Sequence, residues 1–144
     1  MFGKLVSWKL EFFRIMNNQS LKVMVVEDEP LLLEAIGKKL EKEGIETILC
    51  PGGKEAIDTL NNSGGVPNAI WLDYYLKDMD GLSFMGVVKQ NPKWQDIPVI
   101  VVSNSANAQK VNNMLALGAK KYLLKAEYRL DDIVKIIREL APDD

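Results

Sequence analysis

The sequence has no histidine and a single cysteine, Cys50, among its 144 residues. Without histidine there is no Ser-His-Asp or Cys-His nucleophile, no histidine general base and no histidine ligand for zinc. One cysteine forms neither an internal disulfide nor a thiolate metal cluster, which fits a reducing compartment. Any chemistry of this chain therefore depends on carboxylates, hydroxyls, lysine and backbone amides, with a hard cation as the natural addition.

The chain also lacks a large excess of charge and a long apolar run. Its 18 Lys and Arg residues face 20 Asp and Glu, a formal net charge of −2, so no broad positive field attracts nucleic acid. No apolar run approaches the roughly 20 residues that cross a bilayer. We expect a soluble cytoplasmic domain that neither binds nucleic acid directly nor inserts into a membrane.

Short apolar runs alternate with segments of helical periodicity from residue 21 onward. The expected strands are 21–26, 46–50, 69–72, 97–102 and 122–124. The expected helices are 30–43, 53–60, 80–89, 107–117 and a last helix near Asp131, whose carboxylate would cap it. Residues 61–67 are a loop by composition. Strict alternation of strand and helix predicts an α/β domain with a parallel sheet covered by helices on both faces.

Residues 1–20 stand apart from this domain, which we assign to 21–144. Apolar side chains at Leu5, Trp8, Phe12 and Ile15 have helical spacing, typical of a short amphipathic helix. Three interpretations stay open. The segment is a tail or a misassigned start, it packs on this domain or a second copy, or it lies on a membrane surface.

Polar residues end four of the five strands. Glu27 and Asp28 follow the first strand, Asp73 the third, Ser103 the fourth and Lys125 the fifth. Ligands of open parallel sheets bind outside the carboxyl ends of the strands, so we expect these side chains to converge. Carboxylates at such a short distance repel one another unless a cation binds between them, and Mg²⁺ prefers oxygen ligands. An Asp beside Mg²⁺, lysine and a hydroxyl is suited to accept a phosphoryl group.

Each of these residues also has a purely structural interpretation. The acidic residues 27–29 could favour the start of the first helix, and Asp80 is a cap or turn residue before Gly81. Taken singly, Lys125 is a solvated surface charge and Ser103 a loop or capping hydroxyl. Asp73 resists this interpretation best, because an acid directly after the buried run 69–72 needs a partner or a function. The joint arrangement favours a site.

From about Leu21 to Leu140 the chain resembles the receiver domain of bacterial two-component response regulators. The matching residues are Glu27, Asp28, Asp73, Asp80, Gly81, Ser103, Gly118, Tyr122 and Lys125. No single one of these residues is specific for the family, but their order and their positions at strand ends together are specific for it. The resemblance implies a flavodoxin-like, doubly wound five-stranded parallel sheet in the order 2-1-3-4-5.

The resemblance also implies a role for each residue of the acidic site. Asp73 is the phosphoacceptor, which takes phosphate from a histidine kinase, a phosphotransfer protein or a small acyl phosphate. Mg²⁺ is held by Asp28, by Glu27 through water, by Asp73 and by the backbone carbonyl of Tyr75. The absence of histidine means that this chain can accept from a phosphohistidine but cannot carry one.

The remaining matched residues imply a switch. Lys125 pairs with the phosphoryl group, Ser103 closes on its oxygens, and Tyr122 turns inward. The face made by the helix 107–117, the strand 122–124 and the last helix then changes its affinity for a protein partner. The chain ends four residues after Leu140, so we expect output through a protein target, self-association as a homodimer, or onward relay. No enzymatic activity is expected beyond self-phosphorylation and autodephosphorylation.

The chain departs from the family pattern at four positions. Ala126 and Lys77 stand where proline is frequent, Tyr75 is larger than is usual at its position, and Asn104 is bulkier than the usual Ala or Gly. A cis bond before a non-proline costs about 3–4 kcal/mol, so we expect a trans bond at Ala126 and a reshaped loop, or else local strain. These departures leave an alternative open, a receiver-like interaction module regulated without phosphorylation.

Overall fold

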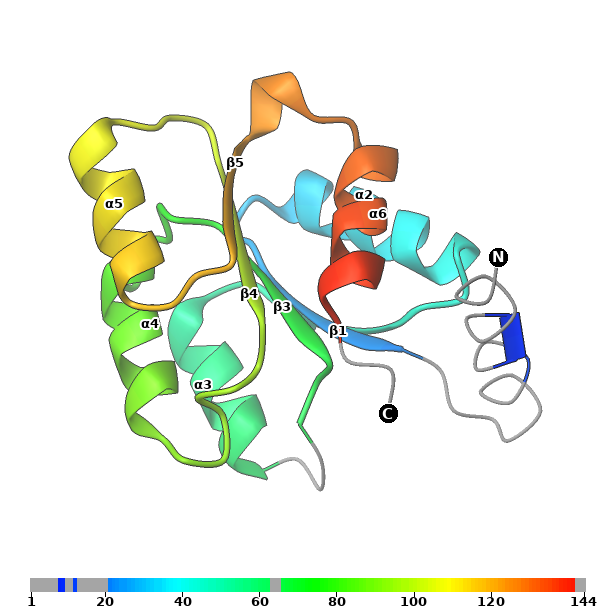
Figure 1. The fold of residues 1–144 in the computed structure, drawn as a ribbon, viewed down its shortest axis with the longest axis horizontal. Coiled ribbons are helices and arrows are strands. Elements are labelled where there is room, and N and C mark those ends of the chain that lie inside the picture. The colour runs from blue at the N-terminus through cyan, green and yellow to red at the C-terminus, as the bar shows by residue number, and fades with distance from the viewer. Residues whose placement is uncertain (1–7, 10–11, 13–20, 63–65, 142–144) are drawn as a thin grey trace.

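The computed structural model describes residues 8–9, 12, 21–62 and 66–141, and their five strands form one parallel sheet (Figure 1). The strands are β1 (Lys22–Val26), β2 (Glu46–Cys50), β3 (Ala69–Leu72), β4 (Val99–Ser103) and β5 (Lys121–Leu124). Their order is β2-β1-β3-β4-β5, so the predicted fold class and strand order are confirmed. The chain reverses its direction of winding at β1, which places β1 and β3 side by side at the centre of the sheet.

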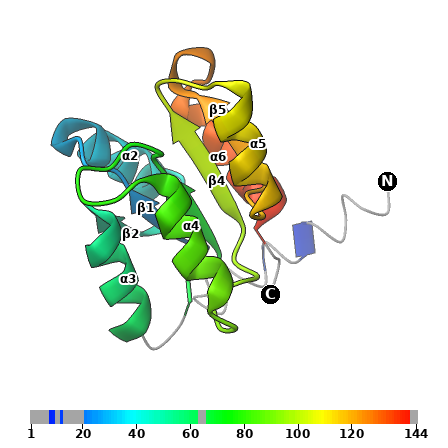
Figure 2. The ribbon, with the colours of Figure 1, turned by 90° about the vertical axis from the view of Figure 1, so that its left-hand side faces the viewer.

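Helices cover both faces of the sheet. They are α2 (Pro30–Lys42), α3 (Gly53–Asn62), α4 (Gly81–Gln90), α5 (Ala108–Ala116) and α6 (Leu130–Leu140), and a 3-10 turn η1 (Lys125–Glu127) precedes α6. Figures 1 and 2 show α2 and α6 on one face and α3, α4 and α5 on the other. This arrangement leaves the carboxyl ends of the strands accessible at one edge.

Two apolar cores explain why the strands have nearly continuous apolar sequences. Along β1, Met24 and Val26 pack under α3, α4 and α5, whereas Val23 and Val25 pack under α2 and α6. All four side chains are fully buried. A strand between two helical layers has no solvated face, so alternation of apolar and polar residues is lost.

The element boundaries match the predictions with a few differences. Pro30 is in the first turn of α2, and Gly44, with a φ of 76°, lies just beyond its end in the left-handed region that glycine tolerates. The helix predicted over 53–60 continues to Asn62, although the composition of residues 61–67 is typical of a loop. The strand predicted from residue 97 begins at Val99.

The predicted cap of the last helix is wrong. Helix α6 begins at Leu130, and the carboxylate that accepts the Arg129 N–H belongs to Asp132, at 3.0 Å. Asp131 instead forms an ion pair with Lys39 of α2. The Asp131 carboxylate, which the local sequence predicted as the helix cap, therefore pairs with a lysine on a neighbouring helix.

Most of the amphipathic segment predicted over 1–20 lies outside the described residues. Residues 8, 9 and 12 are helical, and the rings of Trp8 and Phe12 stack with centroids 5.5 Å apart. In the part of the chain that the structure describes, no helix is long and apolar enough to span a membrane.

Candidate functional site

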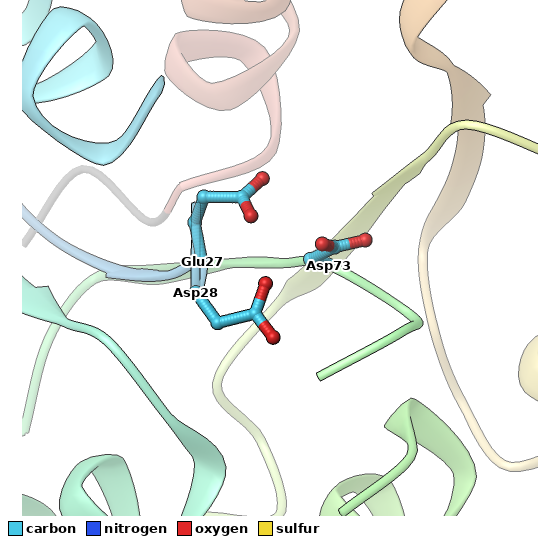
Figure 3. A group of neighbouring side chains, drawn as sticks. All are labelled: Glu27, Asp28 and Asp73. Atoms are coloured by element: carbon cyan, nitrogen blue, oxygen red, sulfur yellow. The ribbon is translucent and has the colours of Figure 1, made fainter. Parts of the chain in front are cut away.

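The carboxyl ends of β1 and β3 bring three acidic side chains together. Val26 of β1 pairs with Leu72 of β3, so the residues that follow these strands emerge side by side. In Figure 3 the side chains of Glu27 and Asp28 extend toward Asp73. One carboxylate oxygen from each residue lies within 4.8 Å of the others. The predicted convergence of these three residues is observed.

The site combines strong burial with an excess of negative charge. Glu27 is 1% exposed and Asp73 is 6% exposed. Lys125 pairs with both, its Nζ 2.8 Å from Glu27 Oε1 and 3.5 Å from Asp73 Oδ2. Lys125 therefore lies closer to Glu27 than to the predicted phosphoacceptor. A single ammonium cannot balance three carboxylates, so the site favours a further cation or a bound proton.

The pKa values reflect this charge imbalance. Burial and then the charge of Glu27 raise the pKa of Asp73 to about 7, although Lys125 acts in the opposite direction. Burial acts to lower the pKa of Lys125, but its bonds to Glu27 and Asp73 outweigh this and raise that pKa above its ordinary value. Lys125 thus stays charged, while Asp73 holds a proton over part of the neutral range.

The carboxylates are oriented by backbone amides, which leaves lone pairs for a metal. The Glu29 N–H donates to Glu27 Oε2 at 3.1 Å, and the Lys77 N–H donates to Asp28 Oδ2 at 2.7 Å. Each ionised carboxylate has about four acceptor positions, so these bonds occupy only a part of them. An all-oxygen, partly exposed donor set fits Mg²⁺, which keeps several waters in an octahedral shell. The role of the Tyr75 carbonyl stays a prediction.

Ser103 and Tyr122 lie on the paired strands β4 and β5. Ser103 ends β4 and is fully buried, and its Oγ accepts the Ser105 N–H at a long 3.4 Å. Tyr122 is half-buried on β5, and its hydroxyl donates to the Ser105 carbonyl at 2.8 Å. Both residues therefore contact the same exposed loop between β4 and α5. The bond from Tyr122 to this loop is solvent-accessible.

A second group of contacts near Asp73 had no signal in the sequence. The Tyr75 ring is 44% exposed, and its hydroxyl bonds to Lys110 of α5 and to Ser105 Oγ. The Lys110 Nζ also lies 4.4 Å from the Tyr75 ring centroid. Lys110, more than Ser105, lowers the pKa of Tyr75. These bonds join the loop after Asp73 to the loop after β4, a contact between residues distant in sequence.

The structure distinguishes the residues that cap helices from those that lie in the acidic site. Asp80 caps α4 by accepting the Ser83 N–H at 2.8 Å, as predicted. The N-cap residue of α2, Glu29, makes no side-chain capping bond, and Glu27 is buried in the site. All described peptide bonds are trans, including the one before Ala126, where the chain forms η1. The expected trans bond is present.

Known proteins with similar sequences share this domain. The chain is 32% identical over 118 residues to the signal transduction histidine-protein kinase BarA of Escherichia coli (strain K12), a match that covers 80% of this chain and 12% of that kinase. The chain thus spans only a small part of that relative. It is 27% identical over 103 residues to the two-component response regulator ORR5 of Oryza sativa subsp. japonica, covering 72% of this chain and 76% of ORR5.

A solved structure with the same fold agrees with these matches. The receiver domain of the Francisella response regulator 1452 superposes with a TM-score of 0.75 and 26% sequence identity, covering 84% of this chain and 96% of that one. The family model described as the response regulator receiver domain matches residues 23–138, which include the acidic edge and all five strands except the first residue of β1. The chain belongs to the family of response regulator receiver domains.

Proposed function

We propose that this chain is the phosphoacceptor of a two-component phosphorelay, phosphorylated on Asp73 in a Mg²⁺-dependent reaction. The observation that carries the proposal is the buried Asp73 carboxylate, within 4.8 Å of those of Glu27 and Asp28 and 3.5 Å from Lys125 Nζ. A nucleophile, a cation site and a fixed ammonium are the parts that phosphoryl transfer needs. Residues 21–144 form the receiver, and residues 1–20 are an extension.

The reaction itself is a displacement at phosphorus. An ionised oxygen of Asp73 attacks the phosphorus of a phosphohistidine or an acyl phosphate, the bond from phosphorus to the donor atom breaks, and an acyl phosphate forms on Asp73. The departing imidazole of a phosphohistidine takes up a proton from water. Lys125 pairs with the phosphoryl oxygens and Ser103 donates a hydrogen bond to them. Mg²⁺, held by Glu27, Asp28 and Asp73, would offset negative charge on the transferred group.

Phosphorylation then biases the switch. The bond from Ser103 to the phosphoryl group replaces its long contact with Ser105, and Tyr122 moves inward, which alters the face formed by α5, β5 and α6. The donor is a histidine kinase or a phosphotransfer protein, and the acceptor of the signal is a protein target or a second copy of the chain. We assign no further enzymatic activity, a cytoplasmic location and no direct contact with nucleic acid.

Incubation with acetyl phosphate and Mg²⁺, followed by intact-mass measurement, tests this function. The wild type should gain one phosphoryl group and bind beryllium fluoride, and Asp73→Asn should do neither. Asp58→Asn is the matched control, because Asp58 is an exposed aspartate on α3. If the wild type gains no phosphate and binds no beryllium fluoride, the proposal fails.

One observation favours the alternative, an interaction module regulated without phosphorylation. The Tyr75 hydroxyl is tied to Lys110 and Ser105, which joins the two loops that border Asp73. Such a link could close the approach to the acceptor in this chain. The same incubation with acetyl phosphate and Mg²⁺ separates the two functions. If this link is what prevents phosphorylation, the wild type should accept no phosphate and Tyr75→Ala, which removes the link, should accept it.

A further inference from the structure

The loop that follows the phosphoacceptor is attached at two adjacent residues. The backbone N–H of Lys77 donates to Asp28 Oδ2 at 2.7 Å. The carboxylate of Asp78 accepts the N–H groups of Gly53, at 3.0 Å, and Lys54, at 2.8 Å. The first attachment joins the loop to a carboxylate of the acidic site, and the second joins it to the start of α3.

Asp78 thus caps a helix from outside that helix. The N–H groups in the first turn of a helix have no intrahelical partner, and a carboxylate is favoured there by the helix dipole. The loop also packs closely on this helix end, because a Cβ built on Gly53 would come 2.6 Å from the Met79 side chain. The absence of a side chain at residue 53 allows this close approach.

The attachment at Lys77 depends on a feature in which this chain departs from its family. Proline, frequent at this position in the family, has no backbone N–H and could not donate to Asp28. The Lys77 side chain is exposed and no hydrogen bond of that side chain contributes to this attachment. The backbone amide, rather than the lysine ammonium, is the group that holds Asp28.

We propose that the Lys77 amide and the Asp78 carboxylate are positioning groups, which fix Asp28 and the loop 74–80 in the arrangement that receives Mg²⁺. This inference rests on the proposed function for the assignment of Mg²⁺ to this site. An oriented carboxylate keeps free lone pairs for a metal and loses less freedom when the metal binds. Partners of metal ligands typically change metal affinity about 10- to 100-fold when they are removed.

The first test separates the amide from the side chain at residue 77. Mg²⁺ affinity is measured on the full chain by titration, with the intrinsic tryptophan fluorescence as the signal, to which the buried Trp71 next to the site contributes. Lys77→Pro removes the N–H, and Lys77→Ala keeps it while removing the ammonium. We expect affinity to fall about 10-fold in Lys77→Pro and to change less than about twofold in Lys77→Ala. Equal affinities in the two variants, or tighter binding in Lys77→Pro, would overturn the proposal.

The second test addresses Asp78 and does not need phosphorylation. Asp78→Ala should speed amide hydrogen exchange at Gly53 and Lys54 in Mg²⁺-free buffer and lower Mg²⁺ affinity about 10-fold. Asp78→Asn keeps one of the two acceptor oxygens, so it can accept only one of the two N–H groups and should give exchange rates and Mg²⁺ affinity between those of Asp78→Ala and the wild type. Faster exchange with unchanged Mg²⁺ affinity would make Asp78 a helix cap only, and the proposal would be wrong.

The two tests also distinguish this inference from the proposed function. If the folded wild type binds Mg²⁺ and the Lys77→Pro and Asp78→Ala variants bind it equally well, only the positioning role fails. If the folded wild type binds no Mg²⁺, the positioning role and the proposed function both fail. Thermal unfolding in Mg²⁺-free buffer identifies any variant that is unfolded, and Asp78→Asn then supplies the comparison.

Discussion

The two corners of the site are held together very differently. At the β1 corner, Glu27 and Asp28 accept short bonds of 2.7–3.1 Å from Lys125 and two backbone amides. At the β3–β4 corner, the side-chain oxygens of Asp73 and Ser103 make long contacts of 3.4–3.5 Å. The carboxylates of Glu27 and Asp28 are therefore fixed before a cation binds. The side chains of Asp73 and Ser103 have weak contacts that new bonds can replace.

Burial does not account for this difference, because Glu27, Asp73 and Ser103 are all buried. The difference lies in the partners. Glu27 is paired with the ammonium of Lys125, and Asp28 accepts a bond from the Lys77 amide. The next residue of that loop, Asp78, caps α3. The β3–β4 corner contacts the exposed loop 104–107, whose bonds to Tyr75 and Tyr122 are solvent-accessible. Charge-assisted bonds are stronger than neutral ones, so the β1 corner should be the costlier of the two to disturb.

Removing Lys125 should break the β1 corner and have the largest effect on stability. Lys125→Met would leave Glu27, which is 1% exposed, without its ion-pair partner. We expect the free energy of unfolding in Mg²⁺-free buffer to fall by about 3 kcal/mol, as for other broken buried pairs. Urea unfolding measures the change. Lys121→Met, which changes an exposed lysine at the start of the preceding strand β5, is the control, and equal losses in the two variants would contradict the comparison.

The charge of Asp73 should make stability depend on pH. Its pKa is about 7 in the folded chain and close to 3.8 when unfolded, so the folded state binds more protons between these values. The free energy of unfolding contributed by this group therefore falls as pH rises from about 4 to about 7. Asp73→Asn removes the charge and should be more stable than the wild type at about pH 8, by on the order of 2 kcal/mol.

Urea unfolding across this pH range, without and with Mg²⁺, checks the prediction. The advantage of Asp73→Asn should vanish at about pH 4 and should shrink when Mg²⁺ is added, because the cation stabilises the wild-type carboxylates. An advantage that does not vary with pH would mean that the charge of Asp73 is not the cause.

Ser103→Ala tests the β3–β4 corner at its buried hydroxyl. Only a 3.4 Å contact from Ser105 N–H to this oxygen is lost, so the free energy of unfolding should fall by about 1 kcal/mol or less. The response of α5 amide shifts to beryllium fluoride should be strongly reduced, while Ser103→Thr retains it. A loss of stability as large as that of Lys125→Met would remove the distinction between the corners.

Tyr122→Phe should have the smallest effect. Its hydroxyl donates to the Ser105 carbonyl at the surface, where water can replace it, so the expected loss is about 0.5 kcal/mol. Thermal unfolding would measure it, with Tyr128→Phe as a control on an exposed tyrosine. A loss well above 1 kcal/mol would show that the loop 104–107 is held more firmly than its few bonds indicate.

The sequence predicted those features that depend on residues close to one another or on the pattern of burial. Features that act within one turn or one element could be predicted from the sequence. They are the strand–helix alternation, the helix start at Pro30, the helix end at Gly44 and the Asp80 cap. The Asp131 cap failed because Lys39 on a neighbouring helix competes for that carboxylate. Charged side chains at helix ends have both local and tertiary partners, and local sequence cannot rank them.

The convergence of Glu27, Asp28 and Asp73 was determined by the sequence, because parallel strands place their carboxyl ends at one edge of the sheet. Which bonds then form among the converged groups was decided only by the tertiary structure. The pairing of Lys125 with Glu27 ahead of Asp73, the bond from the Lys77 amide to Asp28 and the capping of α3 by Asp78 join segments 24 to 98 residues apart. Strand order sets which residues meet, but differences of less than 1 Å in their final packing set which donor reaches which acceptor.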